Sequence, residues 1–122
     1  NLYTYYDYLS DADTVVQNLK NVGVDVNINL VSSENPTSFD LLLSFWNVPA
    51  DPDQYFFWHS TQTQTNIGNY KNVKIDKLLE DGRNTAKLSE RKKFYFDFQK
   101  VINDDPPAAF LYFPYVYTIK RK

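Results

Sequence analysis

The chain has 122 residues and a formal net charge of −2, which suits one domain with a single core and gives no basic face for nucleic acid. Cysteine is absent, so disulfides, thiol catalysis and thiolate metal sites are excluded, and no apolar run is long enough to span a bilayer. Methionine is also absent and the chain begins at Asn1, so we expect a fragment or a processed piece of a longer protein.

The first half of the chain predicts a strand, a helix and a second strand. The β-prone residues 2–6 indicate the first strand. A helix follows, with Ser10 as a weak capping-box signal and Gly23 as the residue that ends it. Apolar and polar residues alternate over 24–30, which predicts a second strand parallel to the first. The polar residues 31–38 predict a loop.

The segment 46–60 follows a predicted third strand, residues 39–46, whose apolar run indicates a central position and burial on both faces. The segment holds both tryptophans, Trp46 and Trp58, and the only histidine. Open α/β sheets bind ligands beyond the C-terminal ends of their strands, and aromatic walls with a few polar groups are typical of ligand pockets. We therefore predict a ligand site in this segment.

The second half predicts a polar loop, two helices and a last strand. Residues 61–72 form the loop, and Asn72 caps a helix with an apolar face. Ser89 caps the next helix, which ends at the run before Pro106, and residues 110–119 predict a strand interrupted by a proline. The buried faces of the two helices are expected to be Ile75, Leu78, Leu79 and Gly82, and then Phe94, Tyr95, Phe98, Val101 and Ile102.

Four blocks of the sequence resemble, in order, the C-terminal lobe of the extracellular solute-binding proteins of family 5. These proteins are the periplasmic or lipid-anchored receptors of peptide-importing ABC transporters. The blocks are residues 18–26; Trp46 with Asp51-Pro52-Asp53; Asn69-Tyr70 with residues 75–79; and residues 90–95 with 105–112.

The resemblance implies an α/β fold with a mixed, mostly parallel sheet flanked by helices, as in one lobe of a type II periplasmic-binding-protein-like receptor. Residues 1–122 are expected to be a single domain and most of the C-terminal ligand-binding lobe. Such a receptor closes on a peptide between two lobes without chemistry, so we expect no enzyme activity, no metal and no cofactor. The implied partners are a peptide or other small solute, the membrane permease and the missing N-terminal lobe. The implied location is extracellular or periplasmic, with a membrane anchor in the full-length protein.

The predicted ligand-binding residues are Trp46, Asn47, Asp51, Trp58, Asn69 and Tyr70. The resemblance implies that, in the peptide receptors of the family, the residue three positions after this tryptophan is an aspartate that pairs with the peptide's α-amino group. At that position this chain has Pro49. The anchor is therefore missing, or Asp51 has taken its place. Without the anchor, a nickel complex or an oligosaccharide becomes a more plausible ligand.

Each candidate residue also has a structural interpretation. Asp51 followed by Pro52 fits a helix N-cap, a role compatible with the rim of a pocket. Either tryptophan fits a core position, and the polar loop residues fit ordinary loop structure.

Two other classes of function remain as alternatives to a receptor. One is a small hydrolase using Asp51 and Asp53 as its carboxylate pair, and the other is a free-standing interaction domain with exposed aromatic residues. His59 and Ser60 do not predict catalysis, because adjacent side chains point apart and cannot form a triad. No known ligand spacing makes Asp51, Asp53 and His59 a metal site.

Overall fold

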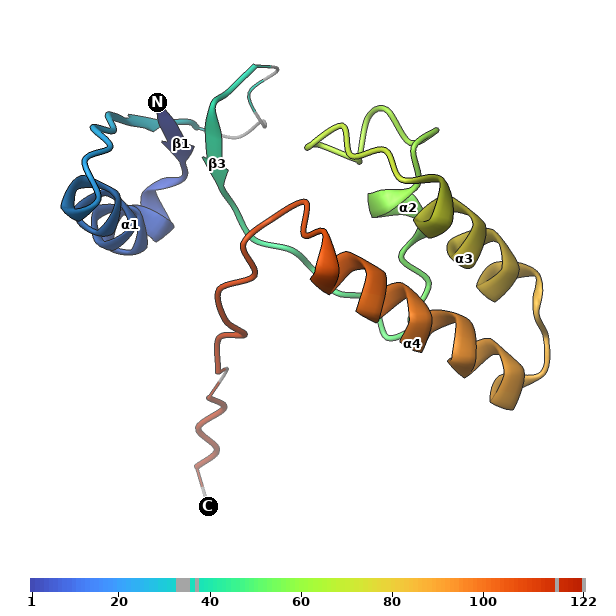
Figure 1. Cartoon of the computed structure of the whole chain (residues 1–122). Helices are drawn as coiled ribbons and strands as arrows, with labels where there is room; N and C mark the ends of the chain where they lie inside the picture. The colour runs from blue at the N-terminus through green and yellow to red at the C-terminus, as the bar shows by residue number, and fades with distance from the viewer. Residues whose placement is uncertain (33–35, 37, 116, 122) are drawn as a thin grey trace. The chain divides into compact units, whose positions relative to one another are not determined.

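The structure is a computed structural model and describes residues 1–32, 36, 38–115 and 117–121 (Figure 1). The chain divides into two compact units, Asn1–Val48 and Pro49–Lys122. The first contains a small sheet and a long helix, and the second contains three helices and the connecting loops.

The sheet of the first unit has three strands, β1 (Leu2–Thr4), β2 (Ile28–Leu30) and β3 (Leu41–Leu43), in the order β2-β1-β3. Both pairings are parallel, with Leu2 opposite Ile28 on one side and opposite Leu41 on the other. This confirms the predicted parallel pairing of the first two strands. All three strands are shorter than predicted, because the three residues of β1 set the length of both ladders.

The prediction that the third strand is central and buried on both faces is wrong in the sheet as described. β1 holds the central position, where Leu2 and Thr4 are buried. β3 pairs with β1 alone, and Leu41 is exposed. The apolar run reflects an edge strand with a hydrophobic sequence, and periodicity does not separate that case from a central strand. Of the predicted loop 31–38, residues 33–35 and 37 lie outside the described residues.

The helix α1 (Leu9–Asn21) connects β1 to β2, contacts both strands and directly follows a short 3₁₀ helix, Tyr6–Tyr8. Because the chain is already helical at Tyr6, Ser10 lies inside α1, and its predicted capping role is wrong. The predicted role of Gly23 is confirmed, because its φ is +84° and its N–H donates to the Lys20 carbonyl. The Val24 N–H donates to the Leu19 carbonyl, which completes a Schellman motif.

Replacing Gly23 with alanine is expected to destabilise the first unit by about 1–2 kcal/mol, the cost of a Cβ in the left-handed region. No atom lies within 4 Å of the added Cβ, so the effect comes from the backbone alone. Urea denaturation followed by circular dichroism measures it. Gly68→Ala is the matched control, since that Cβ also meets open space and Gly68 has no positive φ. Equal stability of the two variants would contradict the prediction.

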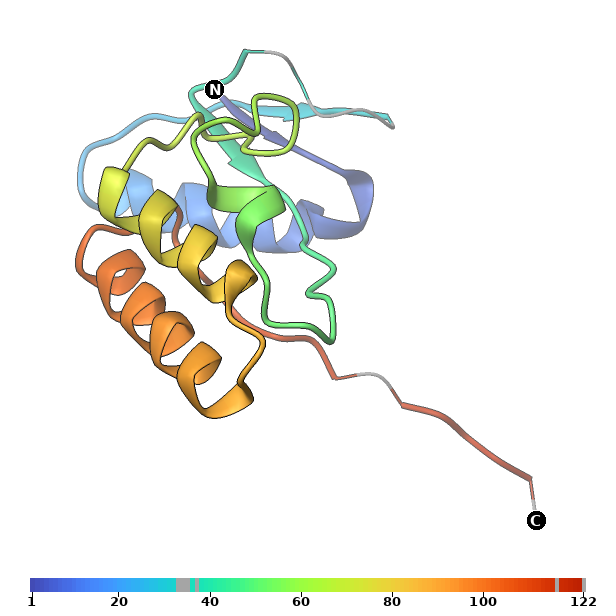
Figure 2. The same cartoon turned by 90° about the vertical axis from the view of Figure 1, so that its right-hand side faces the viewer.

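The second unit consists of α2 (Tyr55–Trp58), α3 (Val73–Asn84) and α4 (Leu88–Asp104). α3 and α4 lie side by side and are joined by a short link, and α2 contacts α3 (Figures 1 and 2). The predicted inner faces of these two helices are confirmed for six of the nine residues, and the other three, Leu78, Phe94 and Val101, are half-buried. The buried residues of α3 and α4 are Ile75, Leu79, Gly82, Tyr95, Phe98 and Ile102.

The helix starts of the second unit agree with only one of the three predicted caps. Asn72 caps α3, because its Oδ1 accepts from the N–H groups of Lys74 and Ile75. Ser89 is not a cap, since α4 begins at Leu88 after Lys87. Asp51 is not a cap either, because α2 begins three residues later than expected.

The residues after α4 form no strand in the part that the structure describes, so the predicted strand at 110–119 is wrong there; position 116 is outside that part. The helix ends at Asp104, before Pro106, as predicted. A strand is stable only with a neighbour that pairs with its backbone. The exposed large side chains of this segment are Phe110, Leu111, Tyr112, Phe113, Tyr115, Tyr117 and Ile119.

Candidate functional site

Asp51 forms a two-pronged ion pair with Arg91 of α4. Arg91 Nη2 donates to Asp51 Oδ1 at 2.7 Å, and Nη1 donates to Oδ2 at 3.1 Å. Arg91 also donates from Nε to the Gly82 carbonyl and from Nη2 to the Tyr95 hydroxyl, both at 3.1 Å. The guanidinium thus joins the 49–54 loop to both long helices.

Asp53 repeats this arrangement two residues later. Its Oδ1 accepts from the Tyr55 N–H at 3.0 Å, and its Oδ2 accepts from Arg83 Nε at 2.9 Å. The Arg83 guanidinium also lies 4.3 Å from the centre of the Tyr55 ring, a cation–π contact. Asp51 likewise accepts from the Asp53 N–H at 2.9 Å. Two consecutive turns closed by aspartate side chains therefore replace the predicted N-cap.

The Asp51–Arg91 pair is expected to make stability depend on pH in the acid range. The hydrogen bonds from Arg91, followed by the Asp53 N–H, lower the pKa of Asp51 from its ordinary value. A lowered folded-state pKa contributes stability that is complete above the unfolded pKa of about 3.9 and is lost as the pH falls through the folded value. The difference in Tm between the wild type and Asp51→Asn should therefore shrink below about pH 4.

Thermal denaturation from pH 7 to pH 2 measures this dependence. Asp97→Asn is the control, because Asp97 pairs with Lys100 on the surface of α4, with both side chains largely exposed. A Tm difference for Asp51→Asn that stays constant over the whole acid range would contradict the prediction.

Trp58 is buried in the second unit, which agrees with its structural interpretation. Its ring lies edge-on to Tyr70 at 6.4 Å and to Phe110 at 6.1 Å between centroids. The Tyr70 hydroxyl donates to Asp105 at 3.2 Å and accepts from Asn72 Nδ2 at 3.0 Å. Burial, followed by the Asp105 carboxylate, raises the pKa of the Tyr70 phenol, and the bond from Asn72 opposes this rise.

Asn66 holds the polar loop 59–72 in shape and was not among the predicted site residues. It is buried, its Nδ2 donates to the Tyr70 carbonyl at 2.7 Å, and its Oδ1 accepts from the Tyr70 N–H at 2.9 Å. Nδ2 also lies 3.4 Å from the His59 carbonyl, which accepts from it. Asn69 completes the turn, since it is exposed with φ +49° and its N–H donates to the Asn66 carbonyl.

His59 and Ser60 both lie against acidic side chains of α3, and Asp76 is close to both of them. The buried His59 ring accepts the Thr61 N–H at Nδ1, and its Nε2 lies 3.3 Å from Glu80 Oε1 and 4.0 Å from Asp76 Oδ1. The Ser60 hydroxyl donates to Asp76 Oδ2 at 2.5 Å. The pair links the loop to α3.

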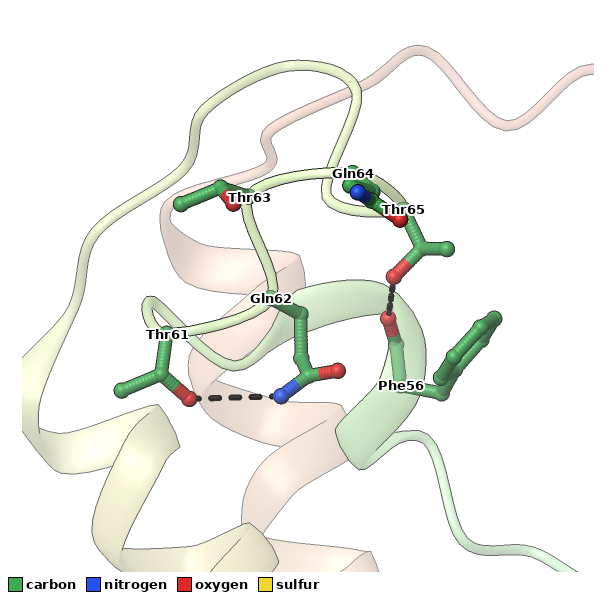
Figure 3. A pocket seen from close by; sticks show the side chains of 6 residues that line it. All are labelled: Phe56, Thr61, Gln62, Thr63, Gln64 and Thr65. Carbon is green, nitrogen blue, oxygen red and sulfur yellow. Dashed lines mark hydrogen bonds between the residues drawn. The ribbon is translucent and has the colours of Figure 1, made fainter.

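A shallow hollow of about 220 Å³ lies over the start of the polar loop. Figure 3 shows Thr65 donating to the Phe56 carbonyl on one side and Gln62 donating to the Thr61 hydroxyl on the other. The lining residues are Phe56, Thr61, Gln62, Thr63, Gln64 and Thr65. The hollow is uncharged and includes none of the six predicted ligand-binding residues.

Within the described residues, no cluster of three or more histidine, cysteine or acidic side chains is suited to hold a metal ion. None of the described helices is both long and apolar enough to cross a membrane.

The six predicted ligand-binding residues fall into both units. Trp46 is half-buried and Asn47 is exposed, and both follow β3 in the first unit. The remaining four belong to the second unit, where Trp58 and Tyr70 are in ring contact and Asn69 and Asp51 are exposed. That these residues bind a ligand stays a prediction. Arg91 was missed because its partner Asp51 lies forty positions away. Asn66 was missed because an asparagine in a polar loop does not reveal that its side chain will bond to the backbone of Tyr70.

Comparisons with known proteins give one strong sequence match. The chain is 32% identical over 113 residues to the oligopeptide-binding protein AppA of Bacillus subtilis, a match that covers 84% of this chain and 21% of AppA. No family model matches the chain.

Solved structures give the same result. The chain matches NikZ from Campylobacter jejuni, solved with Ni(L-His), at a TM-score of 0.78 and 28% identity, over 87% of this chain and 24% of NikZ. It matches Bacillus subtilis AppA, solved with a nonapeptide, at a TM-score of 0.77 and 28% identity, with the same coverage.

A third match shows the fold alone, because its identity is 20%. It is the periplasmic binding protein DppA from Helicobacter pylori, solved with the peptide STSA, with a TM-score of 0.73 over 87% of this chain and 23% of DppA. The chain thus spans about a quarter or less of the length of these relatives. The α/β class is confirmed, and together the matches confirm that the chain is similar to a part of the extracellular solute-binding proteins of family 5.

Proposed function

We propose that this chain is most of the C-terminal ligand-binding lobe of the substrate-binding component of an ABC importer, and that the whole protein binds a peptide between two lobes. The observation that carries the proposal is the 32% identity to an oligopeptide-binding protein over 84% of the chain. The protein acts by reversible binding and not by catalysis. Its partners are the N-terminal lobe and a membrane permease, and it works outside the cytoplasmic membrane, held there by an anchor.

The residues that this proposal assigns to ligand contact are, in the first unit, those after β3 and, in the second unit, the segment 51–58 and the polar loop. Asn47 and Asn69 are exposed amides, and the half-buried Trp46 offers an indole for stacking. Trp58 contacts the ring of Tyr70, the last but two of the loop residues 59–72, edge-on. Amides and aromatic rings suit a peptide, because they recognise its backbone and side chains without requiring one sequence.

The hydrolase alternative has less support. A carboxylate that acts as a base or nucleophile needs an oxygen facing the substrate. Both Asp51 and Asp53 instead pair with arginines, at 2.7 Å and 2.9 Å.

Calorimetry with a mixed nonapeptide tests the proposal. The isolated 122-residue chain supplies half of the cleft, so we expect no detectable heat, and the full-length receptor should bind with micromolar or tighter affinity. Submicromolar binding by the isolated chain would contradict the half-cleft assignment. Failure of the full-length receptor to bind any peptide would overturn the peptide assignment.

A nickel–histidine complex is the second candidate ligand, favoured by the TM-score of 0.78 to NikZ, which was solved with that complex. The same calorimetry with Ni(L-His) separates the two candidates. Binding of the complex by the full-length receptor, with no heat from the peptides, would favour the second.

A further inference from the structure

We infer that Asp51 and Asp53 are positioning residues, which fasten the segment 51–58 to α3 and α4 through Arg91 and Arg83, and that Asp51 does not anchor the charged end of a ligand. The inference rests on the proposed function, in which this segment borders the ligand. It deepens that function by assigning recognition at this segment to neutral groups.

Three of the roughly four acceptor sites of the Asp51 carboxylate are already in use. Oδ1 accepts from Arg91 Nη2 at 2.7 Å and from the Asp53 N–H at 2.9 Å, and Oδ2 accepts from Arg91 Nη1 at 3.1 Å. A fork of this kind has directional geometry that a single ammonium does not match. A ligand amine would therefore meet a carboxylate whose charge is already balanced by a guanidinium bound at both oxygens.

Arg91 is held in place by more than its carboxylate partner. Its Nε donates to the Gly82 carbonyl near the end of α3, and its Nη2 donates to the Tyr95 hydroxyl on its own helix, both at 3.1 Å. The side chain of Arg91 is 21% exposed, whereas that of Asp51 is 58% exposed. The arginine is thus the fixed partner, and the aspartate is the group that it holds.

Asp53 and Arg83 fasten the same segment to the other helix. Arg83 Nε donates to Asp53 Oδ2 at 2.9 Å, and its guanidinium covers the Tyr55 ring. Asp53 Oδ1 accepts the N–H of Tyr55, the first residue of α2. Each long helix therefore contributes one arginine, and together they fix the chain that leads into Trp58.

This double attachment makes the segment rigid before a ligand arrives, which reduces the ordering cost of binding. It also leaves the two carboxylates neutralised by their own partners. Recognition at the segment then depends on amide, carbonyl and ring contacts, and the amino terminus of a peptide contributes nothing through Asp51.

A binding cycle in the full-length receptor tests this assignment. Calorimetry compares a mixed nonapeptide with a free amino terminus and its N-acetylated form, each with the wild type and with Asp51→Asn. We expect the substitution to weaken both peptides, and acetylation to change Kd by the same factor, within about twofold, in both proteins. An acetylation penalty of about tenfold or more in the wild type that disappears in Asp51→Asn would overturn the assignment. Unchanged affinity of Asp51→Asn for both peptides would overturn it as well.

A second measurement needs no ligand and uses the 122-residue chain. In Arg91→Lys, which keeps the charge but not the fork, the carboxyl carbon of Asp51 should titrate closer to its ordinary pKa by NMR. The amides of Asp53 and Tyr55 should exchange about tenfold faster, while that of Leu79 in α3 keeps its rate. Lys92→Gln on the exposed face of α4 is the control and should change neither readout.

Unchanged Asp51 titration and amide exchange in Arg91→Lys would overturn the positioning role. If no peptide binds the receptor, the proposed function fails, and these NMR results still decide whether Arg91 positions the segment.

Discussion

Replacing Leu79 with alanine is expected to destabilise the second unit by about 2–5 kcal/mol, the range for a buried leucine cut back to its Cβ. Leu79 is fully buried on α3, on the face that also carries Ile75. α3 packs beside α4 and contacts α2, so the removed methyl groups leave a cavity in the core of the second unit. Urea denaturation followed by the helical circular dichroism signal measures the loss.

Leu88→Ala is the matched control for this prediction. Leu88 is the first residue of α4 and is 63% exposed, so the same chemical change should alter the free energy of unfolding by no more than about 0.5 kcal/mol. Similar losses for the two variants would show that α3 and α4 do not form a packed core in solution.

Replacing Asn66 with alanine is expected to cost about 1–3 kcal/mol, because it leaves buried backbone groups of the polar loop without partners. The Asn66 side chain serves both the N–H and the carbonyl of Tyr70. Asn66→Asp should cost at least as much although it has the same shape. Its carboxylate has no N–H to donate, and it would face the carbonyls of Tyr70 and His59.

Thermal denaturation measures both variants, with Gln64→Ala as the control. Gln64 lies in the same loop and is exposed, so its loss should have little effect on stability. A loss for Asn66→Asp that is much smaller than the loss for Asn66→Ala would show that shape, and not hydrogen-bond donation, holds the loop.

Some signals that act within one turn of chain were read correctly from the sequence, although the expected caps Ser10 and Ser89 were not. Gly23 ends α1 with a positive φ, and Asn72 caps α3 through its own side chain. The buried stripe of α4, with Tyr95 and Phe98, also follows from the helical period alone. In each case the residues that decide the structure are three or four positions apart.

Features that depend on distant partners were not predictable in this way. The N-cap interpretation of Asp51 was wrong because α2 begins only at Tyr55, and the sequence did not show that Asp51 pairs with Arg91, forty positions away. The strand expected after Pro107 does not form, because β-propensity requires a neighbouring strand that the described residues do not supply. The edge position of β3 depends on the strand order, which no residue within Leu41–Leu43 encodes.

The contact of Trp58 with Phe110 has a practical consequence. Its indole lies against the first aromatic residue of the segment that follows α4. Because the chain has only two tryptophans, a Trp46→Phe variant would emit from this indole alone. Displacement of Phe110 would let water reach the Trp58 ring and shift its fluorescence to longer wavelength. The emission of Trp58 in this variant would therefore report movement at the start of the segment that follows α4.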